Sequence, residues 1–336
     1  MESTIASVAC GFNIKCTRIF RDKFGYICST DKGPVRIQRP SRDKAIMAQN
    51  GHAAEPALLD YIMFQHRVKE QLHENGILVD RFVLSTQGTP YFVVGGECFI
   101  AVYAQTCPNA DFADPSAFLE VVAAVAKMHA SVLLESTAPN HKTAAATADA
   151  NKQLDSLAVL KRKLLKVGKF SEFDMLFLKG CDRLTGHIAG LTAADNEGES
   201  DVQSTIDSTR YFCHNLLKEE NVFYDSKTHA ITITNFSECG GGHFLFDLAY
   251  LIKRCLKAKP ARVAPLDAVL STYSAHHPAA FFSKPHFRRI LLYPDKFVKV
   301  SADYYSKKRS FAPKTYISRI EECLTANDEL EKYIDS

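Results

Sequence analysis

The segment from Cys213 to Asn221 has residue types and spacing suited to the transfer of a phosphoryl group to a hydroxyl. His214 and Asn221 stand seven positions apart. In loops that perform this chemistry, His-x-Asp-x-x-x-x-Asn, the aspartate accepts the proton of the attacking hydroxyl and the asparagine helps to hold magnesium. Leu216 occupies the aspartate position in this chain. The frame of the loop is therefore present, but its proton acceptor is missing.

A second position of the same chemistry also departs from the expected residue. After a predicted hairpin, Asn235-Phe236 stands where such a site has the metal-binding aspartate of an Asp-Phe pair. An amide offers magnesium no negative charge. Loss of a general base alone costs about 10²–10⁴ in rate, and loss of a metal carboxylate should cost more because electrostatic stabilisation is the larger effect. Glu238 is the one nearby carboxylate that could substitute as a metal ligand.

Residues 211–257 resemble the second half of the choline-kinase and aminoglycoside-phosphotransferase superfamily. The resemblance rests on the loop of His214, on Asp247-Leu248-Ala249 and on the C-terminal segments 291–297, 304–308 and 313–314. Within the superfamily the chain is most similar to the spore-coat protein S (CotS-like) branch of endospore-forming bacteria. This resemblance implies an α+β, bilobal, protein-kinase-like fold with a small β-rich N-lobe and a larger, mainly helical C-lobe.

The resemblance also implies roles for individual residues. His214 and Asp247 would support the loop rather than react. The lysine that binds nucleotide phosphates would align with Gln38, which leaves Arg36 and Arg39 as substitute cations, and Asn221 could still contact phosphate. Arginine is not a simple replacement, because its planar group does not act as a compact point charge.

Composition limits the remaining possibilities. A chain of 336 residues with 46% hydrophobic and 24% charged residues is typical of a globular protein with two lobes. A formal net charge of +3 is too small to indicate a nucleic-acid partner. None of the ten cysteines forms a Cys-x-x-Cys pair, so we expect reduced thiols and no zinc site. No signal peptide and no apolar run long enough for a transmembrane segment is visible.

The N-lobe is expected to span residues 1–108 and to be β-rich with one helix. Segments 26–28 and 35–37 flank a turn as a hairpin would. Apolar residues at helical spacing predict a helix over 58–72, which Gly76 ends. Segments 82–84 and 91–94 predict a second hairpin, and 99–103 a further strand.

The C-lobe is expected to span residues 109–336. Asp114-Pro115 predicts the capped start of a helix, within which His129 is expected to lie in the core. Further helices are predicted near 154–167 and 173–191, then from about 247, 266, 285 and 313. Residues 193–208 are expected to form a polar connector, 211–236 the hairpin of the degenerate loop, and Gly240–Gly242 a flexible loop. His276-His277 is expected to be an exposed pair with little metal-binding potential.

These observations favour a catalytically inactive kinase-like protein, a pseudokinase. The resemblance implies a structural component of the bacterial spore coat that needs no cofactor and binds other coat proteins. It would be made in the mother-cell cytoplasm and then assembled onto the spore. The alternative is a small-molecule phosphotransferase that uses ATP and magnesium at an altered site with Glu238 as a substitute ligand. A third hypothesis is a module that senses nucleotide and changes its partner-binding surface.

Overall fold

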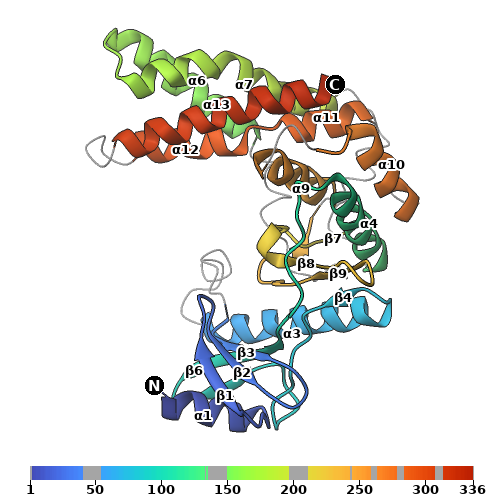
Figure 1. Cartoon of the computed structure of the whole chain (residues 1–336). Helices are drawn as coiled ribbons and strands as arrows, with labels where there is room; N and C mark the ends of the chain where they lie inside the picture. Colours follow the sequence, from blue (N-terminus) through green and yellow to red (C-terminus); the bar gives the residue numbers. More distant parts are fainter. Residues whose placement is uncertain are drawn as a thin grey trace.

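The computed structural model describes residues 2–40, 54–132, 134, 150–196, 211–242, 244–258, 263–277, 284–306 and 313–335. The described chain has a small sheet-containing part followed by a larger helical part, which confirms the predicted α+β class. Figure 1 shows these parts at opposite ends of a curved molecule, with the N-terminus in the sheet part and the C-terminal helices at the far end.

The N-terminal sheet has five antiparallel strands in the order β1-β2-β3-β6-β5. Their bounds are β1 Arg18–Arg21, β2 Tyr26–Ser29, β3 Val35–Gln38, β5 Phe92–Val94 and β6 Glu97–Tyr103. The hairpin predicted over 26–37 is confirmed as β2–β3. The prediction of a hairpin between 82–84 and 91–94 was wrong, because β5 pairs with β6 instead. Gly95 and Gly96 have φ values of 60° and 75°, as a two-residue hairpin turn requires.

Two helices cover opposite faces of this sheet. Alternate residues of β6 explain this arrangement, because successive side chains of a strand point to opposite faces. Phe99 and Ala101 pack with α1 (Glu2–Gly11), whereas Cys98, Ile100 and Val102 pack with α3 (Ala54–Glu74). The sequence predicted α3 but missed α1, so the described part of this lobe contains two helices where one was expected.

The second part contains a small sheet that carries the loop of interest. Its three strands have the order β4-β9-β8, with β4 Leu78–Val79 parallel to β9 Ala230–Ile233 and β8 Val222–Asp225 antiparallel to β9. A separate pair joins β7 Phe212–Cys213 to β10 Gly240–Gly241. The predicted hairpin within 211–236 is thus present. Gly240–Gly241 is a buried strand rather than a flexible loop, and α9 begins directly afterwards at Phe244.

Helices form the rest of this part. Their bounds are α4 Pro115–Ser131, α6 Ala150–Val167, α7 Glu172–Asn196, α9 Phe244–Ala258, α10 Leu266–His276, α11 Lys284–Leu292, α12 Asp295–Ser306 and α13 Pro313–Asp335. Asp114 caps α4 as predicted, accepting hydrogen bonds from the N–H groups of Ser116 and Ala117. Residues 193–196 belong to α7 rather than to the predicted connector, whose remainder lies outside the described residues up to position 210.

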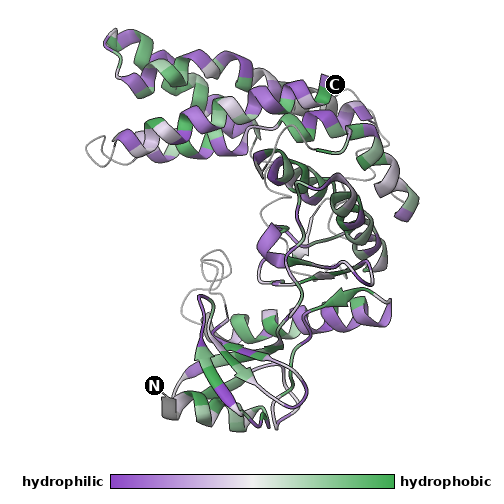
Figure 2. Cartoon of the chain, in the orientation of Figure 1, coloured by the Kyte–Doolittle hydropathy of each residue, from purple (hydrophilic) through white to green (hydrophobic). Residues whose placement is uncertain are grey.

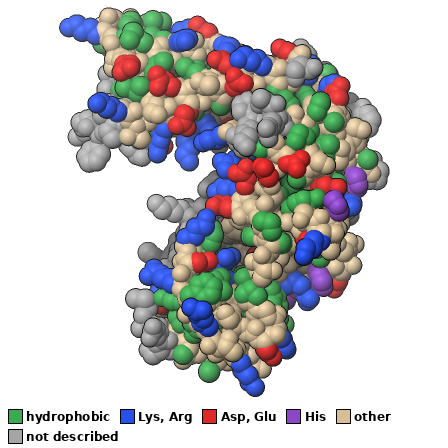
Figure 3. Space-filling view, in the orientation of Figure 1, with side chains coloured by type: hydrophobic (Ala, Val, Ile, Leu, Met, Phe, Trp, Pro, Cys, Tyr) green, Lys and Arg blue, Asp and Glu red, His purple; other side chains and the backbone are tan. Residues whose placement is uncertain are grey.

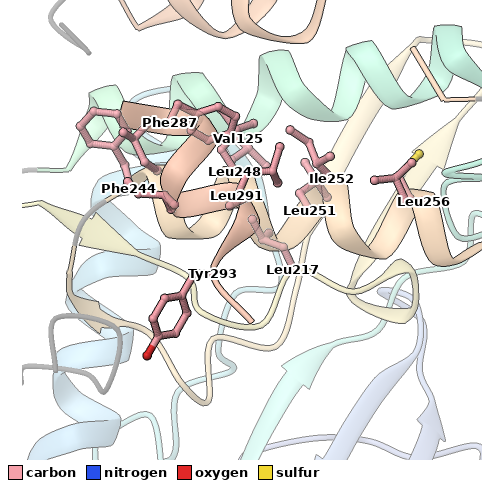
Figure 4. Packing of buried hydrophobic residues seen from close by; sticks show 14 of the residues in the cluster. Val125, Leu217, Phe244, Leu248, Leu251, Ile252, Leu256, Phe287, Leu291 and Tyr293 are labelled. Atoms are coloured by element: carbon pink, nitrogen blue, oxygen red, sulfur yellow. The ribbon is translucent and has the colours of Figure 1, made fainter. Parts of the chain in front are cut away.

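The main core lies around α4 and α9. Figure 4 shows Phe244, Leu248 and Leu251 of α9 beside Val125 of α4, Phe287 and Leu291 of α11, and Leu217 of the candidate loop. Hydrophobic residues dominate α4, whereas the outer helices α6 and α13 carry many hydrophilic ones (Figure 2). The candidate loop therefore packs, through Leu217, against the largest hydrophobic cluster of the described residues.

Three remaining expectations concern the chain as a whole. The boundary after residue 108 stays a prediction, although the N–H of Ala110 already donates to the carbonyl of Val222 in β8 at 2.9 Å. All ten cysteines are free thiols. Among the described residues, no helix is both long and apolar enough to cross a membrane.

Candidate functional site

Asp247, in the first turn of α9, organises the candidate loop. Its Oδ2 accepts the backbone N–H of His214 at 2.6 Å and its Oδ1 accepts that of Asn215 at 2.8 Å. His129 of α4 contributes a third hydrogen bond, from Nε2 to Oδ2 at 3.1 Å. Burial alone would raise the pKa of the Asp247 carboxyl, but the hydrogen bonds from His129 and His214 hold it below its usual value. Asp247 is thus an ionised, buried support for the loop.

Two buried histidines near α9, His129 and His277, have structural roles. His129 is 2% exposed, and its Nδ1 lies 2.7 Å from the hydroxyl of Tyr273 in α10. His277 is 3% exposed and its ring stacks against those of Tyr273 and Phe244, so the expectation that it is exposed was wrong. The described residues hold no group of three His, Cys, Asp or Glu side chains that could bind a metal ion.

His214 fixes the path of the chain on both sides of the loop. Its Nε2 donates to the carbonyl oxygen of Thr234 at 3.0 Å, and its Nδ1 accepts the N–H of Leu216 at 3.2 Å. Burial lowers its pKa below the usual value. A neutral imidazole with one donor and one acceptor satisfies both contacts. His214 therefore has no nitrogen left for a nucleophilic or metal-binding role.

Leu216 is the residue that the sequence analysis expects at the proton-acceptor position. Its side chain is partly exposed, and its carbonyl oxygen accepts a hydrogen bond from Nδ2 of Asn221 at 2.8 Å. The loop is closed by backbone contacts that do not depend on the side chain at position 216. The local geometry thus survives without the aspartate.

Asn221 and Asn235, the two residues at the expected metal-binding positions, are in contact with each other. The Nδ2 of Asn235 donates to the Oδ1 of Asn221 at 3.3 Å. Asn221 is 2% exposed, and its own Nδ2 is bound to the carbonyl of Leu216. A magnesium site needs oxygens that converge on the cation and carry negative charge. Here one amide satisfies the other, with no charge on either.

A buried ion pair that the sequence analysis missed lies beside Asn235. The Oδ2 of Asp80 accepts the backbone N–H of Asn235 at 3.2 Å, and its Oδ1 lies 2.8 Å from Nζ of Lys69. The same ammonium group donates to the carbonyl of Asp80 at 2.7 Å. Asp80 follows β4, whose parallel pairing with β9 brings it to the loop. The available signal was a charged residue at the end of an apolar strand, but Asn235, to which it binds, lies 155 positions further along the chain.

Arg36, Gln38 and Arg39, the residues of the N-terminal sheet that were expected to contact phosphate, each have partners within that sheet or its turns. Gln38 lies opposite Ile100 in the β3–β6 ladder. Arg36 donates to Asp22 at 3.1 and 3.3 Å, and Arg39 donates to both carboxylate oxygens of Glu97 at 2.6 Å. Both substitute cations are therefore already paired with a carboxylate.

A further ion pair connects the N-terminal sheet to the candidate loop. Nζ of Lys23, in the turn between β1 and β2, lies 3.1 Å from Oε2 of Glu220. Both side chains are largely exposed, so the pair contributes little to stability. It does bring the turn over the loop that contains Leu216 and Asn221.

Glu238, the proposed substitute ligand, takes part through its backbone. Its carbonyl oxygen accepts Nδ2 of Asn215 at 3.0 Å. Among the described contacts its carboxylate makes none with Asn235. Burial is the main reason why the pKa of Tyr250 on α9 is raised, and the Glu238 carboxylate adds to this. Of the two carboxylates, Asp80 is the one that reaches the Asn235 backbone.

The chain matches no protein-family model and no curated protein sequence. Solved structures do share its fold. An aminoglycoside phosphotransferase from Alicyclobacillus acidocaldarius superposes with a TM-score of 0.75 at 14% identity, over 98% of this chain and 94% of the other. Spectinomycin phosphotransferase APH(9)-Ia, in complex with ADP and spectinomycin, gives 0.60 at 11% identity, over 98% of both chains. Amicoumacin kinase hAmiN, in complex with AMP-PNP and Ca²⁺, gives 0.54 at 13% identity, over 98% and 93%.

These likenesses define the class of fold. The chain has an aminoglycoside phosphotransferase-like fold over nearly its whole length, as the sequence predicted. At such low identity the likeness establishes the fold and not the activity. The chemistry of this chain must be argued from its own residues.

Proposed function

We propose that this protein is a catalytically inactive member of the phosphotransferase fold, a pseudokinase that works through binding rather than turnover. The single observation that carries the proposal is the contact between Asn235 and Asn221. These two side chains would have to share a magnesium ion, but they satisfy each other as neutral amides. The missing proton acceptor at Leu216 adds a second, independent defect.

The energetics of the two defects support the same conclusion. Loss of a general base lowers the rate by about 10²–10⁴. Phosphoryl transfer depends still more on the metal that neutralises charge on the phosphates. The Asp80 carboxylate is the nearest alternative ligand, but the buried Lys69 ammonium already neutralises it. A cation bound there would have to displace the ammonium group.

The proposed biological role is that of a structural or interaction component of the bacterial spore coat, with other coat proteins as partners. It is supported by the resemblance of Asp247-Leu248-Ala249 and segments 291–297 and 304–308 to spore-coat protein S. Synthesis in the mother-cell cytoplasm followed by assembly onto the spore belongs to the same proposal. A fluorescent fusion expressed in sporulating cells should concentrate around the developing spore. A uniform cytoplasmic signal throughout sporulation would contradict this role.

A second candidate is a small-molecule phosphotransferase that uses ATP and magnesium. The observation in its favour is the likeness to phosphotransferases over the whole chain. It would require Glu238 to turn towards Asn235, or Lys69 to release Asp80. Either movement should be induced by the metal–nucleotide complex, which makes this candidate testable by ligand binding.

The test is thermal unfolding with ATP, with magnesium and with both. A ligand at about one hundred times its dissociation constant stabilises the folded state by about 2.7 kcal/mol. We expect no magnesium-dependent stabilisation by ATP in the natural chain. A magnesium-dependent shift would refute the inactive site and favour the phosphotransferase.

Substitution at the two degenerate positions sharpens this test. We expect Leu216→Asp combined with Asn235→Asp to create a magnesium-dependent shift with ATP, because the rest of the loop keeps its geometry. Asn13→Asp combined with Leu84→Asp is the control of equal added charge, because Asn13 also has a positive φ (51°) and both residues are exposed in the N-terminal part. A shift in the control as large as that in the double variant would mean that the added charge acts nonspecifically.

A further inference from the structure

The end of the α6–α7 hairpin combines exposed hydrophobic and basic side chains. Residues 161–175 contain five Lys or Arg and two Asp or Glu. Four large apolar side chains within this stretch are strongly exposed: Leu165 by 54%, Val167 by 66%, Phe170 by 41% and Met175 by 56%. We call residues 161–175 the hairpin tip.

The geometry of the tip is fixed by local hydrogen bonds. Gly168 ends α6 with a φ of 67°, and its N–H donates to the carbonyl of Leu164 at 3.2 Å. Ser171 and Asp174 then form a reciprocal cap at the start of α7, in which each side chain accepts the other's backbone N–H. The exposed side chains are therefore presented by a well-defined turn.

The inner face of the same hairpin is fully packed. Phe173 stacks on Tyr304 of α12 with ring centroids 3.7 Å apart, and Phe177 stacks on Phe297 at 5.7 Å. The hydroxyl of Tyr305 donates to Asp174 at 2.9 Å. The packing of α7 on α12 is therefore formed by other side chains, and Phe170 and Met175 remain exposed.

The basic side chains of the tip are largely available. Lys161 is bound to Asp182 on α7. Across the part of the chain that the structure describes, Lys163, Lys166 and Lys169 lie in no ion pair with a carboxylate, and all three are exposed. Of the two acidic residues of the tip, Glu172 is exposed, whereas Asp174 is 1% exposed and accepts a hydrogen bond from Tyr305. The exposed charges of the tip are therefore mainly positive, and they lie beside its apolar side chains.

The position of the tip suits a flat partner. Figure 1 shows the α6–α7 hairpin ending at the outer edge of the helical layer, far from the N-terminal sheet. Figure 3 shows basic, hydrophobic and acidic side chains together at this projecting end. A projecting tip that exposes both apolar and basic side chains complements an anionic lipid surface, which accepts apolar groups and attracts Lys and Arg. A protein partner would instead need a concave site of its own.

We propose that the hairpin tip is a peripheral membrane-binding site that inserts Leu165, Val167, Phe170 and Met175 into an anionic bilayer. Lys163, Lys166 and Lys169 would contact the lipid headgroups. This inference is independent of the fate of the phosphotransfer site, because the tip shares no residue with it.

The first test is co-sedimentation of the whole chain with vesicles. We expect binding to phosphatidylcholine vesicles that contain phosphatidylglycerol, weak binding to pure phosphatidylcholine, and loss of binding as salt is added. Replacing Lys163, Lys166 and Lys169 with Gln should weaken binding by about 100-fold, because each cation near an anionic surface contributes about fivefold. The matched control replaces the exposed Lys32, Lys127 and Lys227 with Gln, which removes the same charge elsewhere.

The second test measures insertion directly. The chain contains no tryptophan, so Phe170→Trp provides a single fluorescent probe at the tip. We expect its emission to shift to the blue on addition of the anionic vesicles. Tyr103→Trp is the matched control, because Tyr103 is also 41% exposed but lies at the end of β6. Its emission should not shift.

Three results would overturn the proposal. The first is that the natural chain does not bind the anionic vesicles. The second is that the tip and control triple variants bind equally well. The third is that the emission of the Phe170→Trp variant shows its indole in water while the protein is bound. Polyglutamate provides the last discrimination. If it binds as tightly as the vesicles, and Leu165→Ser with Phe170→Ser weakens neither interaction, the tip is a site for an acidic protein rather than a membrane.

Discussion

Substitution of Lys69 by Met should strongly destabilise the protein. The Lys69 side chain is 3% exposed, and its ammonium group contacts both the carboxylate and the carbonyl oxygen of Asp80. It also lies over the rings of Phe82 and Phe236, at 4.2 and 5.3 Å from their centroids. Methionine retains most of the apolar stem but removes the charge, so the variant isolates the electrostatic contribution of Lys69.

The magnitude follows from what the substitution leaves behind. Without Lys69, the Asp80 carboxylate, 11% exposed, loses its ion pair, and its carbonyl oxygen loses a hydrogen-bond donor. Breaking a buried ion pair by removing one partner costs about 3–5 kcal/mol. We expect a decrease of this size in the free energy of unfolding, measured by urea titration followed by circular dichroism.

A second substitution tests the reason for this loss. Asp80→Asn removes the unpaired charge but keeps an acceptor for the N–H of Asn235. Replacing a buried ion pair with uncharged groups is often close to neutral, so the double variant should recover at least about 1 kcal/mol relative to Lys69→Met. Lys127→Met, at an exposed position, should stay within about 0.5 kcal/mol of the natural chain. The reasoning fails if Lys69→Met costs less than about 1 kcal/mol, or if Asp80→Asn makes the variant less stable.

Three further predictions concern the buried polar groups of the fold. Asp247→Ala should lower the free energy of unfolding by at least about 3 kcal/mol, because three buried donors lose their acceptor and each costs about 1–3 kcal/mol; a loss under about 1 kcal/mol in the same urea titration would contradict its supporting role. Tyr61→Phe should cost about 1–2 kcal/mol, since the hydroxyl contacts the carbonyl oxygens of Ser237 and Cys239 at 3.2 and 2.8 Å, and an unchanged urea midpoint would show that these contacts are dispensable. Burial lowers the pKa of His277 to about 4 from 6.5, so the unfolded state binds a proton first and stability should fall as the pH drops from about 6.5 to about 4. His277→Phe should flatten the melting temperature over this window, and an unchanged slope would assign the acid sensitivity to other groups.

Local signals were sufficient for most of the helices and for the first hairpin. Asp114-Pro115 predicted the start of α4. Gly76 was expected to end the preceding helix, and α3 ends two residues before Gly76, whose φ is 77°. The helix α1 was missed because its apolar residues are buried only by contact with one face of the sheet, which is formed by later segments of the chain. Gly95-Gly96 marks the true hairpin turn between β5 and β6. The apolar segments 82–84 and 91–94 mimic a hairpin because they also flank a polar turn.

The chemical content of the candidate site was visible in the sequence because it depends on residue types at fixed spacing. Leu216 cannot accept a proton and Asn235 cannot carry charge in any fold, so these two chemical limits of the loop can be read from the residue types alone. The roles of His214, Asn221 and Asp247 as the frame of the loop stay a prediction; the structure places the Asp247 carboxylate on the N–H groups of His214 and Asn215. Spacing alone did not reveal that Arg36 and Arg39 are already paired with carboxylates.

Contacts between distant segments were decided only by the tertiary structure. The sequence determined the α+β class and the residue types at positions 216 and 235, because alternation, helical spacing and residue chemistry are local properties. The fold decided that Asn235 would bind Asn221, that Asp80 would meet Lys69 beside them, and that Phe173 would be buried while Phe170 stays exposed. These outcomes depend on which surfaces compete for burial once the chain is compact, and that competition is a property of the whole core rather than of any one segment.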